Sequence, residues 1–267
     1  MVTNIQTAPQ HTLARPMSYE AYKSRLWNLA ERFPVCQLQT IGVTAAGRSL
    51  YAMSVGGEGD LPSAAYIGGI SGGDWLSAAV LLRFLEEYSR LLEENGRLYR
   101  VHLPALFTRR RICVCPMVNW DAAELFREKG EENPDSYRNG LGADLTAFFA
   151  DGKEAPEKCP EAVALRQYLL YQTPGVLVCV RGGGKGGLTI PKQPSPRAGA
   201  VGRLLSRMLT LPEYGEPDTS AAIPAWYAAE SGRPAYCVSL GESGGEDSFY
   251  RGYAAVRELL YSAPLLI

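Results

Sequence analysis

Histidine is almost missing from this chain: His11 and His102 are the only two among 267 residues. His11 lies in a polar N-terminal stretch, and His102 precedes an apolar segment that begins near Ile112. A Ser-His-Asp triad needs an imidazole beside its nucleophile, and a histidine-based metal centre needs imidazoles close together. Neither histidine is near a strand end where such a site would form, so the sequence argues against both.

Long apolar runs and an excess of one charge are missing too. No segment reaches the ~18 apolar residues that a membrane span requires, and residues 1–15 contain no apolar stretch of signal-peptide length. The 27 basic and 28 acidic residues leave a formal net charge of −1, which gives no reason to expect nucleic acid or an anionic membrane as a partner. We therefore expect a cytoplasmic protein that binds neither.

Cysteine pairs of the CxxC type are absent, although the chain contains six cysteines. Four of them lie inside apolar runs that are typical of central strands: Cys113, Cys115, Cys179 and Cys237. A thiol in such a run behaves as a small buried hydrophobe. We therefore expect reduced core cysteines rather than a disulfide or a metal site.

The chain does contain a regular alternation of apolar strands and amphipathic helices. The predicted strands are residues 37–43, 49–55, 64–70, 112–118, 176–180 and 235–240, and the predicted helices are 19–33, 75–94, 121–128, 161–171, 198–209, 223–231 and 247–261. This order favours a single α/β domain with a mixed, mostly parallel sheet between helices. We assign that domain to residues 18–267, preceded by an N-terminal tail of residues 1–17.

Ligands of such a sheet gather where its parallel strands end, and the loops that leave those ends are residues 71–74, 119–121, 181–187 and 239–242. The third of these loops is a glycine run around Lys185. It lacks the Gly-x-x-x-x-Gly-Lys-Ser/Thr spacing of a phosphate-binding loop. We expect a flexible rim of the site, whose backbone N–H groups and Lys185 could still bind an anion.

Several segments, taken in chain order, resemble the M14 family of zinc carboxypeptidases, particularly its bacterial γ-D-glutamyl-diamino-acid peptidase branch. The matching segments are residues 41–51 ("IG.S..GR.iyal" in the family), 66–77 ("idagiHaREWis"), 115–121 ("vPmvNPDG"), 137–145 ("WraN..GvDLN") and 234–241 ("P.fTiElG"). The resemblance implies an eight-stranded mixed sheet between helices and a cleft built for zinc-dependent peptide hydrolysis.

The residues that would carry this chemistry are different in this chain. The family's zinc needs two imidazoles and a carboxylate, with a glutamate nearby as general base. The corresponding ligand positions hold Ser71, Asp74 and Arg181, and the base position holds Ser239. Glu242 is the one nearby carboxylate that could replace the base. Because a guanidinium stays protonated and repels a dication, we expect no metal ligands and no bound zinc.

The positions that would recognise substrate are altered as well. The family's Asn-Arg pair, which holds the substrate carboxylate, corresponds to Thr146 and Ala147. The arginine that stabilises the oxyanion corresponds to Arg138, although a solvated loop arginine is an equal alternative. Where the family holds a cation beside a carboxylate, we expect Asp74 and Arg181 to pair directly, so that the guanidinium takes the place of the metal charge.

These substitutions favour a non-catalytic homologue that binds a peptide or a muropeptide fragment. Its expected ligand-binding residues are Arg138, Arg181 and Lys185, and no catalytic residue is assigned. A second hypothesis is an enzyme with altered chemistry, in which Ser71, Asp74, Arg181 and Ser239 work without a metal or a metal is held by ligands that the motifs do not reveal. A third is a carboxypeptidase or γ-D-glutamyl-diamino-acid peptidase with residual activity, whose ligands lie elsewhere in the alignment.

Overall fold

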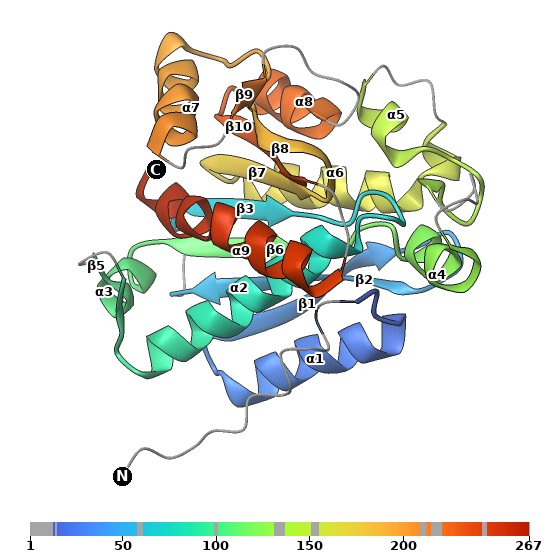
Figure 1. Cartoon of the computed structure of the whole chain (residues 1–267), viewed down its shortest axis with the longest axis horizontal. Coiled ribbons are helices and arrows are strands. Elements are labelled where there is room, and N and C mark those ends of the chain that lie inside the picture. Colours follow the sequence, from blue (N-terminus) through green and yellow to red (C-terminus); the bar gives the residue numbers. More distant parts are fainter. Residues whose placement is uncertain are drawn as a thin grey trace.

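The chain is seen in a computed structural model that describes residues 13, 15–57, 61–98, 101–130, 137–150, 155–208, 212–214, 221–241 and 245–266. The described residues form one eight-stranded sheet in the order β1-β2-β6-β3-β7-β10-β8-β9 (Figure 1). Its strands are β1 (Cys36–Val43), β2 (Ser49–Gly56), β3 (Ser63–Ile67), β6 (Arg111–Cys115), β7 (Val176–Arg181), β8 (Gly183–Thr189), β9 (Glu213–Tyr214) and β10 (Ala235–Gly241). The central strands β6, β3, β7 and β10 are parallel, and antiparallel strands flank them. The predicted mixed sheet is confirmed.

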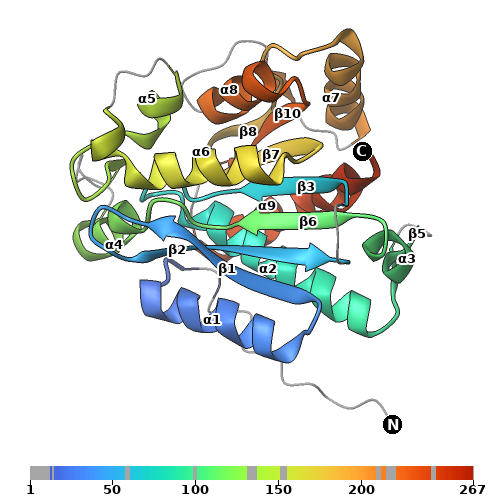
Figure 2. The ribbon, with the colours of Figure 1, turned by 180° about the vertical axis from the view of Figure 1, so that it is seen from behind.

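Helices cover both faces of this sheet. On one face α2 (Trp75–Glu93) packs against α9 (Gly245–Ser262), while α5 (Leu145–Ala150), α6 (Pro160–Gln172) and α8 (Ala222–Ser231) lie on the other (Figures 1 and 2). The remaining elements are α1 (Tyr19–Arg32), α3 (Leu103–Phe107), α4 (Trp120–Lys129), α7 (Pro196–Met208) and a small hairpin of β4 (Arg97–Leu98) and β5 (Val101–His102). Helix α1 packs on β1 and is joined to α2 by an ion pair of 2.9 Å between Arg25 and Glu86.

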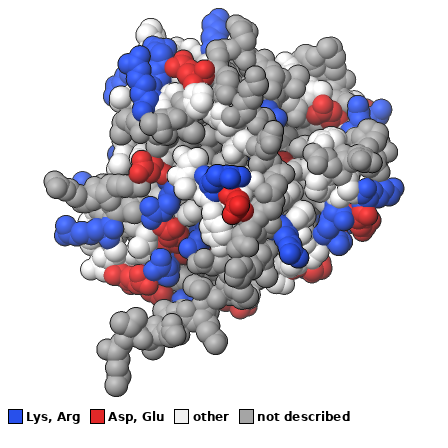
Figure 3. All heavy atoms as spheres, in the orientation of Figure 1, with Lys and Arg blue, Asp and Glu red and all other residues white. Residues whose placement is uncertain are grey.

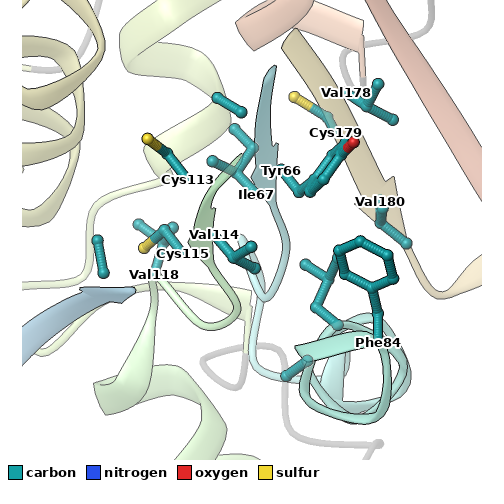
Figure 4. Packing of buried hydrophobic residues seen from close by; sticks show 14 of the residues in the cluster. Tyr66, Ile67, Phe84, Cys113, Val114, Cys115, Val118, Val178, Cys179 and Val180 are labelled. Atoms are coloured by element: carbon teal, nitrogen blue, oxygen red, sulfur yellow. The ribbon is translucent and has the colours of Figure 1, made fainter. Parts of the chain in front are cut away.

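The apolar runs become central strands because both of their faces are covered. Every residue of β3 is buried, as are residues 176–180 of β7. Figure 4 shows Val180 directed toward Phe84 of α2, whereas Cys179 projects from the opposite side of β7. Burial of the cysteines, expected from the sequence, is therefore observed, and all six are free thiols.

Two segments differ from the sequence prediction. The glycine run, expected as a flexible loop, forms strand β8, which pairs antiparallel with β10. Gly183 has a φ of +80°, a conformation that glycine adopts without strain, and this allows the chain to reverse past the end of β10 immediately after β7. Leu13, assigned to the tail, is only 1% exposed and belongs to the core.

Lysine and arginine are interspersed with aspartate and glutamate on the face that Figure 3 shows. Within the described part of the chain, no helix combines the length and apolar character needed to cross a membrane. The parallel strands β3, β6, β7 and β10 have their carboxyl ends at one edge of the sheet.

Candidate functional site

A cavity of about 220 Å³ lies at the carboxyl ends of the parallel strands. It is lined by Ile70, Ser71, Asp74, Tyr137, Asp144, Thr146, Cys179, Val180, Arg181, Gly182, Ile223 and Cys237. We call this cavity the cleft. The structure thus brings together Ser71, Asp74, Thr146 and Arg181. The first and the last of them are more than a hundred residues apart in the sequence.

Asp74 is the buried carboxylate of the cleft. Its backbone N–H donates to the Ser71 carbonyl at 3.0 Å, forming the turn that leads into α2. Its side chain does not cap α2. Instead, Oδ1 accepts a hydrogen bond of 2.5 Å from the backbone N–H of Gly182. The residue is only 4% exposed, and this burial raises the pKa of the carboxyl group to about 7, although the Gly182 hydrogen bond and the Arg181 charge oppose the shift.

The expected direct pair between Asp74 and Arg181 stays a prediction. Both residues line the cleft, and the Arg181 charge lowers the pKa of Asp74, although it is a smaller influence than the Gly182 hydrogen bond. β7 ends at Arg181, and the backbone N–H of the next residue, Gly182, reaches the Asp74 carboxylate.

The raised pKa predicts how stability depends on pH. Unfolded, an aspartate titrates near 3.9, so between about pH 4 and 7 the folded chain holds a proton at Asp74 that the unfolded chain has lost. This group's contribution to stability is therefore full below about pH 4 and falls as pH rises toward 7. We expect Asp74→Asn to increase the free energy of unfolding at pH 8 by about 2 to 4 kcal/mol and to flatten its pH profile.

Denaturant unfolding at pH 5 and pH 8 measures this effect. The exposed residue Asp247 on α9 provides the matched control, and Asp247→Asn should leave the difference between the two pH values unchanged. If Asp74→Asn lowers the free energy of unfolding equally at both pH values, the ionised Asp74 carboxylate does not destabilise the fold at alkaline pH, and the prediction is wrong.

Three of the predicted site residues are not part of the cleft lining. The Ser239 hydroxyl donates to the Gly183 carbonyl of β8 and is not part of the lining. Arg138 donates to the Gly142 carbonyl at 2.8 Å and lines a separate hollow of about 490 Å³. Ala147 is absent from the lining, and its N–H donates to Asp144 at the start of α5. The predicted oxyanion role of Arg138 therefore has no support in its position.

The side chain of Lys185, together with Glu242 and His11, lies outside the described residues. His102 belongs to β5, at the opposite end of the sheet from the cleft (Figure 1), and its Nε2 is 2.8 Å from Asn95 Oδ1.

The sequence assigned no site role to four of the residues that line the cleft: Tyr137, Asp144, Cys179 and Cys237. One signal for Cys179 was available. Side chains two residues apart in a strand share a face, so Cys179 had to lie on the same side of β7 as Arg181. Asp144 caps α5 through Oδ1, which accepts from the Thr146 N–H at 2.8 Å, and this local role places its carboxyl group at the cleft.

The donor set at this edge does not fit a catalytic zinc ion. The family's ion takes imidazoles and a carboxylate and leaves a position open for water, whereas the cleft lining contains no histidine. Its polar groups are hydroxyls, the carboxylates of Asp74 and Asp144, the thiols of Cys179 and Cys237, and the Arg181 guanidinium. Searched across the described residues, histidine, cysteine, aspartate and glutamate form no group of three or more that could hold a metal ion.

The comparison with known proteins decides the family. The family model described as zinc carboxypeptidase, of the peptidase M14 type, matches residues 22–164, more than half of the 267-residue chain. The chain belongs to the zinc carboxypeptidase family. The match ends before β7, so Arg181 and Ser239 lie beyond it.

Solved carboxypeptidase structures share this fold across nearly the whole chain. A metallo-carboxypeptidase from Burkholderia cenocepacia has a TM-score of 0.76 at 14% identity and covers 94% of this chain and 70% of its own. A metallo-carboxypeptidase from Pseudomonas aeruginosa, in complex with (2-guanidinoethylmercapto)succinic acid, has a TM-score of 0.71 at 17% identity, with coverages of 94% and 69%. At these identities the likeness concerns the fold alone.

A curated relative is similar over a shorter stretch. The uncharacterized protein YqgT of Bacillus subtilis (strain 168) is 24% identical over 105 residues, which are 39% of this chain and 28% of that protein. The chain therefore matches less than a third of that relative's length.

Proposed function

We propose that this zinc carboxypeptidase family member binds a peptide or muropeptide fragment in its cleft without hydrolysing it. The observation that carries the proposal is that a cleft is present at the strand ends, while the side chains that line it are not those of a zinc site. The cleft lies at the strand ends, yet Arg181 lines it, and the buried Asp74 bonds to a backbone N–H.

The charges of the cleft support an anionic ligand group. Each of its carboxylates already accepts backbone hydrogen bonds, Asp74 from Gly182 and Asp144 from Thr146 and Ala147. Arg181 brings a permanent positive charge to the lining. A carboxylate of a peptide would be attracted to that guanidinium, which makes it the principal ligand-binding residue of the proposal.

The branch of the family suggests the ligand. The sequence motifs resemble those of γ-D-glutamyl-diamino-acid peptidases, whose substrates are cell-wall peptides, and by this analogy we propose a muropeptide fragment in a cytoplasmic setting. The family's substrate-carboxylate pair is replaced at Thr146 and Ala147, so we expect the ligand carboxylate to bind nearer to Arg181.

Three measurements on the purified chain test the proposal. After dialysis we expect no stoichiometric zinc by metal analysis and no hydrolysis of γ-D-glutamyl-diaminopimelate peptides. In a thermal-shift assay with the same peptides at millimolar concentration, we expect the melting temperature to rise by about 2 °C or more, because a ligand that prefers the native state raises its apparent stability.

Two arginine variants make the binding test specific. Arg181→Ala should abolish the thermal shift, and Arg109→Ala, which alters an exposed arginine outside the cleft lining, should preserve it. Stoichiometric zinc with peptide hydrolysis would instead establish an active hydrolase. A thermal shift that survives Arg181→Ala would place the ligand elsewhere.

A further inference from the structure

Two buried thiols occupy paired positions on neighbouring strands at the cleft. Cys179 of β7 and Cys237 of β10 are Cα partners in the parallel register. They are 4% and 2% exposed, respectively, and both line the cavity of about 220 Å³. Each thiol is therefore buried, and each borders the same space.

The two side chains also share a face of the sheet with the Arg181–Ser239 register pair, which lies two residues further along both strands. Burial raises the pKa of the Cys179 thiol well above its ordinary value, and the neighbouring Cys237 and Asp74 raise it further. The two thiols are thus close enough to influence each other's charge.

The two thiols are free in the structure. Paired positions on adjacent strands lie ~4.8 Å apart, which is within the ~4.4 to 6.8 Å Cα separation of disulfides, so the register itself allows either a disulfide or an ion held between the sulfur atoms. Two metal–sulfur bonds of ~2.3 Å placed end to end span about 4.6 Å, a length of the same order as the strand spacing.

The donor number and type select the ion. Thiolates are soft ligands that favour Cu(I) among biological metals, and a two-coordinate arrangement suits a monovalent ion better than zinc, which takes four ligands in structural sites. We propose that Cys179 and Cys237 form a binding site for a soft monovalent cation of the Cu(I) type.

Binding can be written as a balanced exchange. The two thiols release two protons and the metal cation takes their place, giving a bis-thiolate complex with a net charge of −1. The protons leave to water through the cleft that both thiols line. Arg181, on the same face and two residues from Cys179, offsets the negative charge. No oxidant or reductant is needed, because the metal keeps its oxidation state.

An anaerobic titration with Cu(I) against a chromogenic chelator tests the site, with Ag(I) as a redox-inert second probe. We expect one equivalent to bind to the unaltered chain and either Cys179→Ser or Cys237→Ser to weaken binding at least about 100-fold. Cys115→Ser is the matched control, because this thiol is equally buried but lies on β6, and it should bind as the unaltered chain does. X-ray absorption at the metal should give two sulfur neighbours.

If a serine hydroxyl in the core prevents folding, the titration is repeated with Cys179→Ala and Cys237→Ala. Circular dichroism shows which variants are folded. Equal binding by the Cys179 and Cys115 variants, or binding of several equivalents without preference, would overturn the site. The inference does not depend on peptide binding: Cu(I) uptake and the peptide-induced thermal shift are separate readouts, so either can fail alone.

Discussion

Replacing Ser71 and Arg181 with histidine and Asp74 with glutamate is expected to yield a protein that retains about one zinc ion per chain. The three residues line the same cleft, so the variant would present two imidazoles and a longer carboxylate, the ligand types of the family's site. It would also remove the guanidinium that repels a dication. Chelator competition should show zinc affinity about 100-fold above that of the unaltered chain, or roughly 2.7 kcal/mol.

The double variant Ser71→His, Asp74→Glu, which keeps Arg181, is the control and should gain far less. If the triple variant folds but takes up no more zinc than the double variant, these positions do not converge as ligands, and zinc loss by substitution is the wrong explanation. We expect no hydrolysis even with zinc, because Ser239, at the position that corresponds to the family's general base, has no carboxylate, and its hydroxyl donates to the Gly183 carbonyl.

Glu161→Ala is expected to reduce the free energy of unfolding by about 3 kcal/mol. Glu161 is fully buried at the start of α6. Its carboxylate accepts from the Ala45 N–H at 2.8 Å and from Asn139 Nδ2 at 2.9 Å. Removing it leaves the part-buried Ala45 N–H, in the connection between β1 and β2, without its acceptor and takes one acceptor from the buried Asn139 amide. An unsatisfied buried donor costs about 1 to 3 kcal/mol.

Glu157→Ala is the control, since this glutamate is exposed a few residues earlier in the chain, and its change in stability should stay within about 0.5 kcal/mol. Urea unfolding of both variants gives the comparison. A loss at Glu161 no larger than at Glu157 would mean that the carboxylate does not hold the β1–β2 connection to α6. The loss in free energy of unfolding for Glu161→Gln should lie between those of Glu161→Ala and Glu157→Ala. Its amide oxygen can still accept from the Ala45 N–H, but its amide nitrogen would face the Asn139 amide nitrogen, and two donors cannot bond to each other.

Much of the fold could be predicted from periodicity. Residues 19–33 were predicted as a helix and form α1 over Tyr19–Arg32, and residues 176–180 were predicted as a strand and form β7 over Val176–Arg181. These elements were predictable because their apolar spacing matches the face they bury. The glycine run was misread as a loop, since glycine has no strand preference of its own and β8 forms through its pairing with β10.

The site was only partly predictable. Strand ends indicated that Ser71, Asp74 and Arg181 would share one edge, and all three line the cleft. Motif alignment also placed Arg138 there, yet its guanidinium turns to the Gly142 carbonyl at 2.8 Å. An alignment reports which residue occupies a position in the chain, but the direction of a long side chain depends on which acceptor lies closest in space.

By itself, the sequence determined which chemical groups stand at this edge: a serine hydroxyl, an aspartate carboxylate and an arginine guanidinium, at positions where the family's motifs have imidazoles and a glutamate. It also determined the strands that bring these groups together, because apolar periodicity is local. The tertiary structure alone decided their partners. Asp74 bonds to the N–H of Gly182, 108 residues away in the chain, and Cys179 lies beside Cys237 through strand register. Such contacts depend on how distant segments pack, which no local pattern encodes.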